Sequence, residues 1–387
     1  MDLSFLKKTC FVKTALVLTV MFFCARFFTA NVIAANKYEG ISVSAESAVL
    51  IEASSGQIIW SKNANKRLPM ASTTKIMTAL VAIENFDIEK TVEISPDAIG
   101  IEGSSIYLYK GEKLSMLDLL YAMLLESAND AATAIAIAVG GNVEGFADMM
   151  NEKAEDLGLK TTHFSNPHGL DDPEHYTTAE ELGKIAVEAM KNDTFKQIVS
   201  TYKRTIPLNE TEGVRLLINH NKMLKAYNGA IGIKTGYTKK SGRCLVSAAE
   251  KDGVELIAVT LNAPDDWRDH KTMLDLGFSL YESRVLCQSG SFRQIQTVIG
   301  GKESYVVLTN KEDVIAVVRK DSAQIKCTVE LFRFSYAPIK SGDIVGRLVY
   351  TLDGKEIAAT PVYSTQTVER IEYRQSLFDR LFSFLFK

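Results

Sequence analysis

The sequence predicts a mixed α/β (α+β) fold, in which an antiparallel sheet carries a helical subdomain, followed by a small all-β C-terminal domain. Three observations predict it. Apolar residues recur at helical spacing between residues 72 and 190, three apolar runs at 232–261 alternate with turn residues as in a β-meander, and short β-rich runs without helical period fill the chain from about residue 288. The 387 residues, 46% of them hydrophobic, are enough for two domains with cores of their own.

The first 35 residues have the pattern of a secretory signal peptide. Lysines, the last of them Lys13, precede an apolar run at 14–24, and apolar residues continue to Ala35 with Arg26 as an interruption. Small residues before Ala35 suit signal-peptidase cleavage. A transmembrane anchor is the alternative, which Arg26 disfavours. We therefore expect an exported protein.

Composition excludes several function classes. A net charge of −3 gives no electrostatic case for nucleic acid. Outside the signal the chain keeps Cys244, Cys287 and Cys327, which cannot all pair and match no zinc spacing. The five histidines show no metal-ligand spacing either. No metal and no cofactor are therefore expected.

The catalytic part of the chain is predicted to begin with a hairpin and a helix. Two apolar runs within 48–60 flank Gly56, which is typical of a hairpin with a glycine-containing loop. Ile76, Leu80 and Ile83 then recur at helical spacing and form one apolar stripe.

Ser72 and Lys75 stand three residues apart at the start of this helix, just after Pro69, which suits a helix entry. Residues at this spacing share a helix face, so the hydroxyl and the amine can meet. A serine hydroxyl is a weak nucleophile until a base takes its proton, and a lysine serves as that base when burial or another cation lowers its pKa. The alternative is a capping serine beside a solvated lysine.

Ser127 and Asn129 lie in a polar break between two apolar helices. A capping-box-like start at Ser115 opens the first helix, and an Ala-rich run at 131–139 forms the second. Polar groups between two buried helices need partners or a cleft. The alternative is a simple turn capped by Ser127 and Asp130.

The rest of the chain is predicted to be a loop at 166–172, a helix at 179–191 and a strand with a loop at 203–218. The meander strands are expected at 232–237, 244–249 and 254–261, with Lys234 on the first, and a helix at 265–281 closes this part. Beyond it, β-rich runs are expected at 295–299, 305–308, 314–318, 325–331, 344–352 and 356–362.

The C-terminal tail is amphipathic and too short to span a bilayer, but it suits a position in the membrane interface. Its apolar side is formed by Leu377, Phe378, Leu381, Phe382, Leu385 and Phe386. The alternative is a helix docked on the β-rich domain. The expected layout is a signal peptide at 1–35, a catalytic domain at 36–287, a β-rich domain at 288–365 and a membrane-anchor tail at 366–387.

Three short motifs stand in chain order: Ser72-x-x-Lys75, Ser127-x-Asn129 and Lys234-Thr235-Gly236. This ordered set resembles the active site of penicillin-binding proteins and serine β-lactamases, with their transpeptidase/β-lactamase-like fold. Segments 71–77, 126–131 and 232–238 resemble most closely the low-molecular-mass D-alanyl-D-alanine carboxypeptidases. That family also has a β-rich second domain and a C-terminal amphipathic anchor.

The resemblance implies a reaction and a place. Such enzymes remove the terminal D-alanine from peptidoglycan pentapeptide stems through an acyl-enzyme, and β-lactam antibiotics bind them covalently. It implies action at the outer face of the cytoplasmic membrane or in the cell wall, with membrane contact through the C-terminal helix.

It also implies roles for individual residues. Ser72 would be the nucleophile, Lys75 the base in acylation, Ser127 the proton relay toward the leaving amine, and Asn129 a ligand of the substrate amide.

The third motif would bind the other end of the substrate. Lys234 and Thr235 would hold the terminal carboxylate, and Gly236 would let the substrate lie beside the strand. The backbone N–H groups of Ser72 and Tyr237 would form the oxyanion hole.

Two departures separate the chain from β-lactamases. Ala128 stands where class A enzymes usually have Asp, and no Glu-x-x-Leu-Asn loop for a deacylating water is present. A D,D-endopeptidase cutting crosslinks uses the same residues and remains an alternative, ahead of a β-lactamase. A non-catalytic wall-binding protein is disfavoured by the intact trio.

Overall fold

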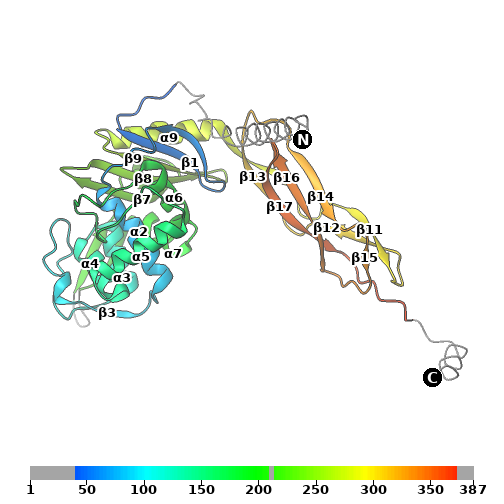
Figure 1. Cartoon of the computed structure of the whole chain (residues 1–387), viewed down its shortest axis with the longest axis horizontal. Coiled ribbons are helices and arrows are strands. Elements are labelled where there is room, and N and C mark those ends of the chain that lie inside the picture. The colour runs from blue at the N-terminus through cyan, green and yellow to red at the C-terminus, as the bar shows by residue number, and fades with distance from the viewer. Residues whose placement is uncertain (1–39, 209–212, 373–387) are drawn as a thin grey trace, which may run out of the picture. The chain divides into compact units, whose positions relative to one another are not determined.

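The computed structural model describes residues 40–208 and 213–372 (Figure 1). The expected signal peptide and residues 373–387 of the expected tail lie outside the described residues. Within the described part of the chain, no helix is both long and apolar enough to cross a membrane.

A five-stranded antiparallel sheet supports the catalytic part, in the order β2-β1-β9-β8-β7. Its strands are β1 (Ser47–Glu52), β2 (Gln57–Lys62), β7 (Ala230–Thr238), β8 (Gly242–Lys251) and β9 (Val254–Leu261). The predicted hairpin and the predicted meander are both confirmed, and they join because β1 pairs with β9. The strand that carries the third motif, β7, lies at one edge of the sheet.

Helices cover both faces of this sheet (Figure 1). The two that pack on its middle are α6 (Ala179–Met190) and α9 (Asp266–Leu280). A Cβ at Gly183 of α6 would lie 2.5 Å from Ile51, whereas a Cβ at Gly277 of α9 would lie 3.2 Å from Leu50. Neighbouring residues of a strand point to opposite faces, so β1 is buried on both sides, as its six buried residues also indicate.

The helical subdomain packs against one face and contains the residues of the first two motifs. Its elements are η1 (Ala71–Thr74), α2 (Lys75–Asn85), η2 (Pro96–Ala98), α3 (Met116–Leu125), α4 (Asn129–Gly140), α5 (Val143–Asp156), α7 (Asp193–Ser200) and α8 (Met223–Ala226), with the strand pair β3 (Thr91–Glu93) and β4 (Lys113–Ser115). The Ser115 hydroxyl accepts from Asp118 N at 3.0 Å and caps α3, as expected.

Three local expectations differ from the structure. The break between α3 and α4 is not a turn capped by Ser127 and Asp130, because Ala128 is the N-cap of α4 and no side chain caps it. Residues 203–218 form a hairpin of two strands, β5 (Lys203–Pro207) and β6 (Val214–Ile218), instead of one strand and a loop. Helix α9 ends at Leu280, since Tyr281 opens strand β10 (Tyr281–Cys287).

The C-terminal part is all β, as predicted. Six strands form a sheet in the order β14-β16-β17-β12-β11-β15, and β10 pairs with β13. The bounds are β11 (Gln294–Ile299), β12 (Tyr305–Thr309), β13 (Val314–Arg319), β14 (Lys326–Leu331), β15 (Ser335–Tyr336), β16 (Ile344–Leu352) and β17 (Lys355–Ser364). After β17 the chain stays on this domain, because Val368 pairs with Ile339 and Arg370 with Gly301.

Candidate active site

The nucleophile and base of the first motif meet at the junction of η1 and α2. Lys75 Nζ lies 2.9 Å from Ser72 Oγ, as the i, i+3 spacing predicts. Ser72 is half-buried and reaches the cleft, whereas Lys75 has no exposed surface at all. The buried amine therefore approaches the hydroxyl from the protein side.

Lys75 has two further partners, and both are carbonyl oxygens. Nζ donates to Asn129 Oδ1 at 2.6 Å and to the His168 backbone oxygen at 2.7 Å. A charged ammonium can donate to all three neighbours. A neutral amine has two protons, which the two carbonyls accept, and its lone pair is then directed at the Ser72 hydroxyl. The geometry suits a base that takes the proton of Ser72.

Electrostatics favour the neutral form of Lys75. Burial lowers the pKa of Lys75 well below its ordinary value, and the positive charge of Lys234 lowers it further, while Asp130 acts in the opposite direction. Burial also lowers the pKa of Lys234, to about 7. Burial thus makes both lysines easier to deprotonate, and the charge of Lys234 adds to the effect on Lys75.

The His168 carbonyl is placed by the loop at 166–172, which sequence reasoning treated as a plain connection. Asn166 Oδ1 accepts from Gly169 N at 2.7 Å, and Asn166 Nδ2 donates to Leu170 O at 3.0 Å. Gly169 has φ +87° and packs directly on the chain before Ser72, where a Cβ would lie 1.9 Å from Ala71 O. A residue with a side chain cannot occupy this position without moving the loop.

A buried histidine holds the turn that presents Ser72. Ser165 N donates to His175 Nδ1 at 3.0 Å, so the ring proton lies on Nε2 and is donated to Thr74 Oγ1 at 2.7 Å. Thr74 Oγ1 in turn donates to Ala71 O at 2.8 Å. Burial lowers the pKa of His175 to about 4, so the ring is neutral. This chain fixes Ala71 in the left-handed region, with φ +47°.

The second motif contributes Ser127 to the same cleft as Ser72. Ser127 is nearly buried, has φ +61° and lines the cleft. Asn129 contacts Lys75 through Oδ1 and donates from Nδ2 to Glu102 O at 2.5 Å, so its amide links the base to the loop at 102. Asp130 accepts from Leu108 N at 3.0 Å and orders the same wall.

The third motif is brought to Ser72 by the edge strand β7. A Cβ at Gly236 would lie 3.0 Å from Ser72 N, so glycine is what allows the strand to approach the nucleophile. Lys234 is buried and donates to Thr235 O at 3.0 Å. Thr235 lines the cleft, and Tyr237 stands at its rim with 67% of its surface exposed.

Five of the predicted residues line one cleft of about 330 Å³, namely Ser72, Ser127, Thr235, Gly236 and Tyr237, whereas Lys75, Asn129 and Lys234 are buried and do not line it. It is lined by Ser72, Ser104, Ser127, His220, Lys222, Thr235, Gly236, Tyr237, Arg243, Asp266 and Trp267. Ser104, His220, Lys222 and the last three of these residues were not predicted. Arg243 donates to Asp266 Oδ1 at 2.6 Å. It lies opposite Tyr237 in the pairing of β7 with β8, so its position on the strand after the third motif was a sequence signal that could have predicted it.

Comparisons with known proteins identify the family. A family model described as D-alanyl-D-alanine carboxypeptidase matches residues 32–265, more than half of the chain. The chain belongs to the D-alanyl-D-alanine carboxypeptidase family. It is therefore a serine hydrolase of the penicillin-binding type. A second model of this group, the C-terminal domain of penicillin-binding protein 5, matches residues 281–370.

Several D-alanyl-D-alanine carboxypeptidases match over most of the chain. DacF of Bacillus subtilis is 35% identical over 336 residues, which are 84% of this chain and 86% of that protein. DacC of Escherichia coli is 30% identical and covers 87% of both chains. Among solved structures, penicillin-binding protein 5 of Haemophilus influenzae has 28% identity and a TM-score of 0.66, covering 86% of this chain and all of that one. PBP3 of Streptococcus pneumoniae has 25% identity and a TM-score of 0.74, covering 85% of this chain and all of that one.

Proposed function

We propose that this protein removes the terminal D-alanine from peptidoglycan pentapeptide stems through an acyl-enzyme on Ser72. The observation that carries the proposal is the environment of Lys75, whose Nζ is buried, faces two carbonyl acceptors and lies 2.9 Å from Ser72 Oγ. A base held in this way can activate the serine without a histidine or a metal.

The acylation step follows from these contacts. Ser72 Oγ attacks the carbonyl carbon between the two D-alanines while its proton passes to Lys75 Nζ. The negative charge on the carbonyl oxygen is stabilised by the backbone N–H groups of Ser72 and Tyr237. When the C–N bond breaks, the proton that Lys75 took from Ser72 passes through the Ser127 hydroxyl, which lines the same cleft, to the leaving amine. Water then hydrolyses the ester on Ser72 and releases the shortened stem.

The substrate is held by β7 and by α4. Lys234 and Thr235 bind the carboxylate of the last D-alanine, which is the group that distinguishes a free chain end from an internal peptide bond. Gly236 keeps the strand close enough for the scissile bond to reach Ser72. Asn129, which already fixes Lys75, contributes to binding the substrate amide from the same side.

A penicillin fits the same arrangement, because its ring carboxylate and strained amide match the D-alanyl-D-alanine end. The variant Ser72→Ala should not be labelled by a fluorescent penicillin and should release no D-alanine, since loss of the nucleophile costs several orders of magnitude in rate. Ser104→Ala, at another serine that lines the cleft, is the matched control and should keep both activities. Undiminished labelling of a folded Ser72→Ala protein would refute the assignment.

A second experiment separates the proposed reaction from crosslink cutting. The purified protein is offered a muramyl pentapeptide and a crosslinked muropeptide dimer, and products are separated by chromatography. The proposal expects D-alanine from the pentapeptide as the main product. Faster cleavage of the dimer would assign the protein as a D,D-endopeptidase.

We further propose that the protein is exported through residues 1–35 and held at the outer face of the cytoplasmic membrane by its tail. Val368 belongs to the β-rich domain, so the membrane-binding segment is placed at 373–387. Large apolar side chains alternate there with Arg374, Arg380 and Lys387, and each basic residue adds about 1 kcal/mol near anionic lipid.

The tail is tested by sedimentation with vesicles. Protein lacking residues 1–35 should sediment with vesicles that contain phosphatidylglycerol, and the same protein cut after Glu372 should do so far less while keeping its activity on small peptides. If both forms remain in the supernatant, the tail is not an anchor.

A further inference from the structure

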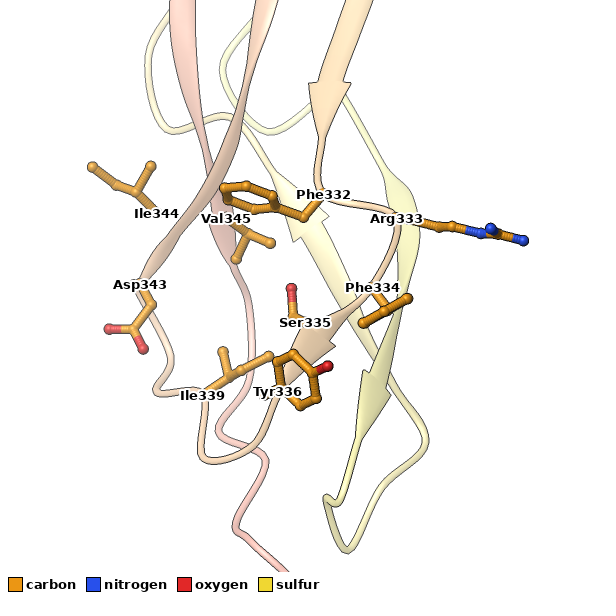
Figure 2. Close-up of a pocket in the computed structure, with 9 residues that line it drawn as sticks. All are labelled: Phe332, Arg333, Phe334, Ser335, Tyr336, Ile339, Asp343, Ile344 and Val345. Carbon is orange, nitrogen blue, oxygen red and sulfur yellow. The ribbon is translucent and has the colours of Figure 1, made fainter.

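A second hollow lies in the β-rich domain, far in sequence from the catalytic motifs. Its volume is about 530 Å³. Three aromatic residues within five consecutive positions, Phe332, Phe334 and Tyr336, contribute to its lining, and Ile339 and Val345 are the buried apolar residues beside them (Figure 2). The remaining lining residues are Arg333, Ser335, Asp343 and Ile344.

The rim of this hollow is unusually apolar for an exposed surface. Phe332 has 77% of its surface exposed, Tyr336 69% and Ile344 65%. Exposed apolar side chains are ordinary when they stand singly, but a cluster around a concave surface is typical of an interaction site. Aromatic rings contribute most to such sites because each buries a large area.

The segment that carries the rings is held in place by the sheet. Gln296, buried on β11, donates from Nε2 to Phe332 O at 2.7 Å. Strand β15 pairs in parallel with the end of β11, and the rings of Phe334 and Tyr336 pack edge to face with centroids 5.6 Å apart. The rings are thus presented by a backbone that is already ordered, which lowers the entropic cost of binding.

The hollow adjoins the point where the chain leaves the domain toward the tail. Ile339 pairs with Val368, and Ile371 N donates to Gly300 O at 2.9 Å, just beyond the strand that pairs with β15. Residue 372 is the last described one, and the amphipathic sequence 373–387 begins directly after it. The segment 373–387 therefore starts close to these rings.

The chemistry beside the rings suits a lipid interface. Arg333 points away from the hollow in Figure 2, and Lys340 stands in the turn after Ile339. Asp343 is the opposing charge, and its Oδ2 accepts from Lys340 N at 2.7 Å, so that carboxylate closes the turn. Aromatic residues flanked by arginine and lysine are typical of proteins at the headgroup level of anionic bilayers.

We propose that the aromatic rim at residues 332–336 is a second membrane-contacting surface, which inserts into the interface of an anionic lipid bilayer beside the tail. This inference rests on the proposed anchoring by residues 373–387 and extends it to the folded domain. The β-rich domain would then bind the bilayer at two adjacent sites, and the domain itself would be held against the membrane.

The experiment uses protein that lacks residues 1–35 and places a tryptophan in its aromatic rim. Phe332→Trp is the probe, and Ile315→Trp on β13 is the matched control, because Ile315 is also exposed, at 52%, but lies away from the hollow. The vesicles contain phosphatidylglycerol together with phosphatidylcholine that has brominated acyl chains. The fluorescence of Trp60 and Trp267 is measured on protein without either substitution and is subtracted. The expected result is a blue shift and quenching for Phe332→Trp and neither for Ile315→Trp.

A loss-of-function arm uses the double variant Phe332→Ser/Tyr336→Ser with the tail intact. Its vesicle affinity should fall by about tenfold or more, because two interfacial aromatic rings are removed. The double variant should keep its rate of labelling by penicillin, which shows that the catalytic part is folded, and its far-UV circular dichroism should be unchanged, which shows that the β-rich domain is folded.

Each other outcome overturns the proposal in a distinguishable way. If the protein sediments with vesicles but Phe332→Trp is not quenched, the tail anchors alone. If the emission of Phe332→Trp is blue-shifted without vesicles and this shift disappears on cutting after Glu372, the tail itself occupies the hollow. If the full chain does not sediment at all, the anchoring proposal fails together with this one.

Discussion

Replacing Gly169 by alanine should disable the active site although Gly169 touches no substrate. The new Cβ would lie 1.9 Å from Ala71 O, whereas such contacts essentially never fall below 3.0 Å, so the two backbones must separate by at least 1.1 Å. The neighbouring His168 oxygen accepts from Lys75 at 2.7 Å, and a shift of that size breaks the hydrogen bond. A misplacement of about 1 Å in a catalytic group costs on the order of 100-fold in rate.

The assay is the second-order rate constant for acylation by a fluorescent penicillin, measured together with thermal unfolding. Gly158→Ala is the matched control, because Gly158 also has a positive φ, +71°, but a Cβ there meets nothing within 4 Å. Both variants should lose roughly 1–2 kcal/mol of stability from the left-handed backbone, but only Gly169→Ala should acylate about 100-fold more slowly. Acylation of Gly169→Ala at the rate of the control would refute the role assigned to the His168 carbonyl.

Three further predictions concern the reaction. Penicillin bound to Ser72 should persist for long after the free drug is removed, because no deacylating glutamate is present, and rapid steady-state hydrolysis of a chromogenic cephalosporin would contradict this. Lys234→Ala should lower activity on a peptide with a free C-terminus by a further ~1.5–3 kcal/mol, or about 10- to 150-fold, relative to the peptide amide; equal losses would mean that Lys234 does not bind the carboxylate. The pH profile of kcat/KM should rise as Lys75 loses its proton below its ordinary pKa and fall as Lys234 loses its own near pH 7. Lys234→Arg should move the falling limb to higher pH, since a guanidinium stays charged, and an unmoved limb would exclude Lys234 as its source.

The reacting side chains were predictable because their chemistry depends on residue type and on short spacings. Ser72 and Lys75 are three residues apart, and a helix brings such residues together without help from the rest of the fold. Lys234 was placed correctly on the first strand of a meander, since apolar runs separated by turn residues predict the strands, and the turn at Asp252 predicts the pairing of β8 with β9.

The supports of the site were harder to predict, because several of them are backbone atoms. Every residue has a carbonyl, so nothing in the identity of His168 indicates that its oxygen binds Lys75. The available signal was Asn166 followed by Gly169, which together indicate a tight turn without indicating what the turn contacts. His175 acts through Thr74 from 101 residues away, and no local pattern reports such a contact.

Non-local pairing explains the remaining differences. In strand β6 the alternating residues Val214, Leu216 and Ile218 are apolar but exposed, so the pattern of apolar residues does not mark a buried strand face. The pairing of β6 with β5 is what makes this segment a strand. Strand β10 directly follows α9 and pairs with β13, whose residues come about 30 positions later. The helical spacing of apolar residues stops near Tyr281 whether the chain continues as a loop or as a strand. The sequence alone therefore does not show that a strand begins there.

The edge position of β7 has a consequence for which ligands the enzyme can distinguish. Among the described strands, β7 pairs with β8 on one side, and Thr235 and Gly236 on that strand line the cleft. An extended peptide lying along this edge can bond to main-chain groups, which are the same for every amino acid. Affinity should therefore grow with the number of stem residues that reach the strand and depend little on their side chains. A bicyclic antibiotic is shorter than a stem peptide and would cover less of that edge, so we expect its hold on the enzyme to depend on the covalent bond, whereas a stem peptide could gain main-chain contacts along its length before any bond is made.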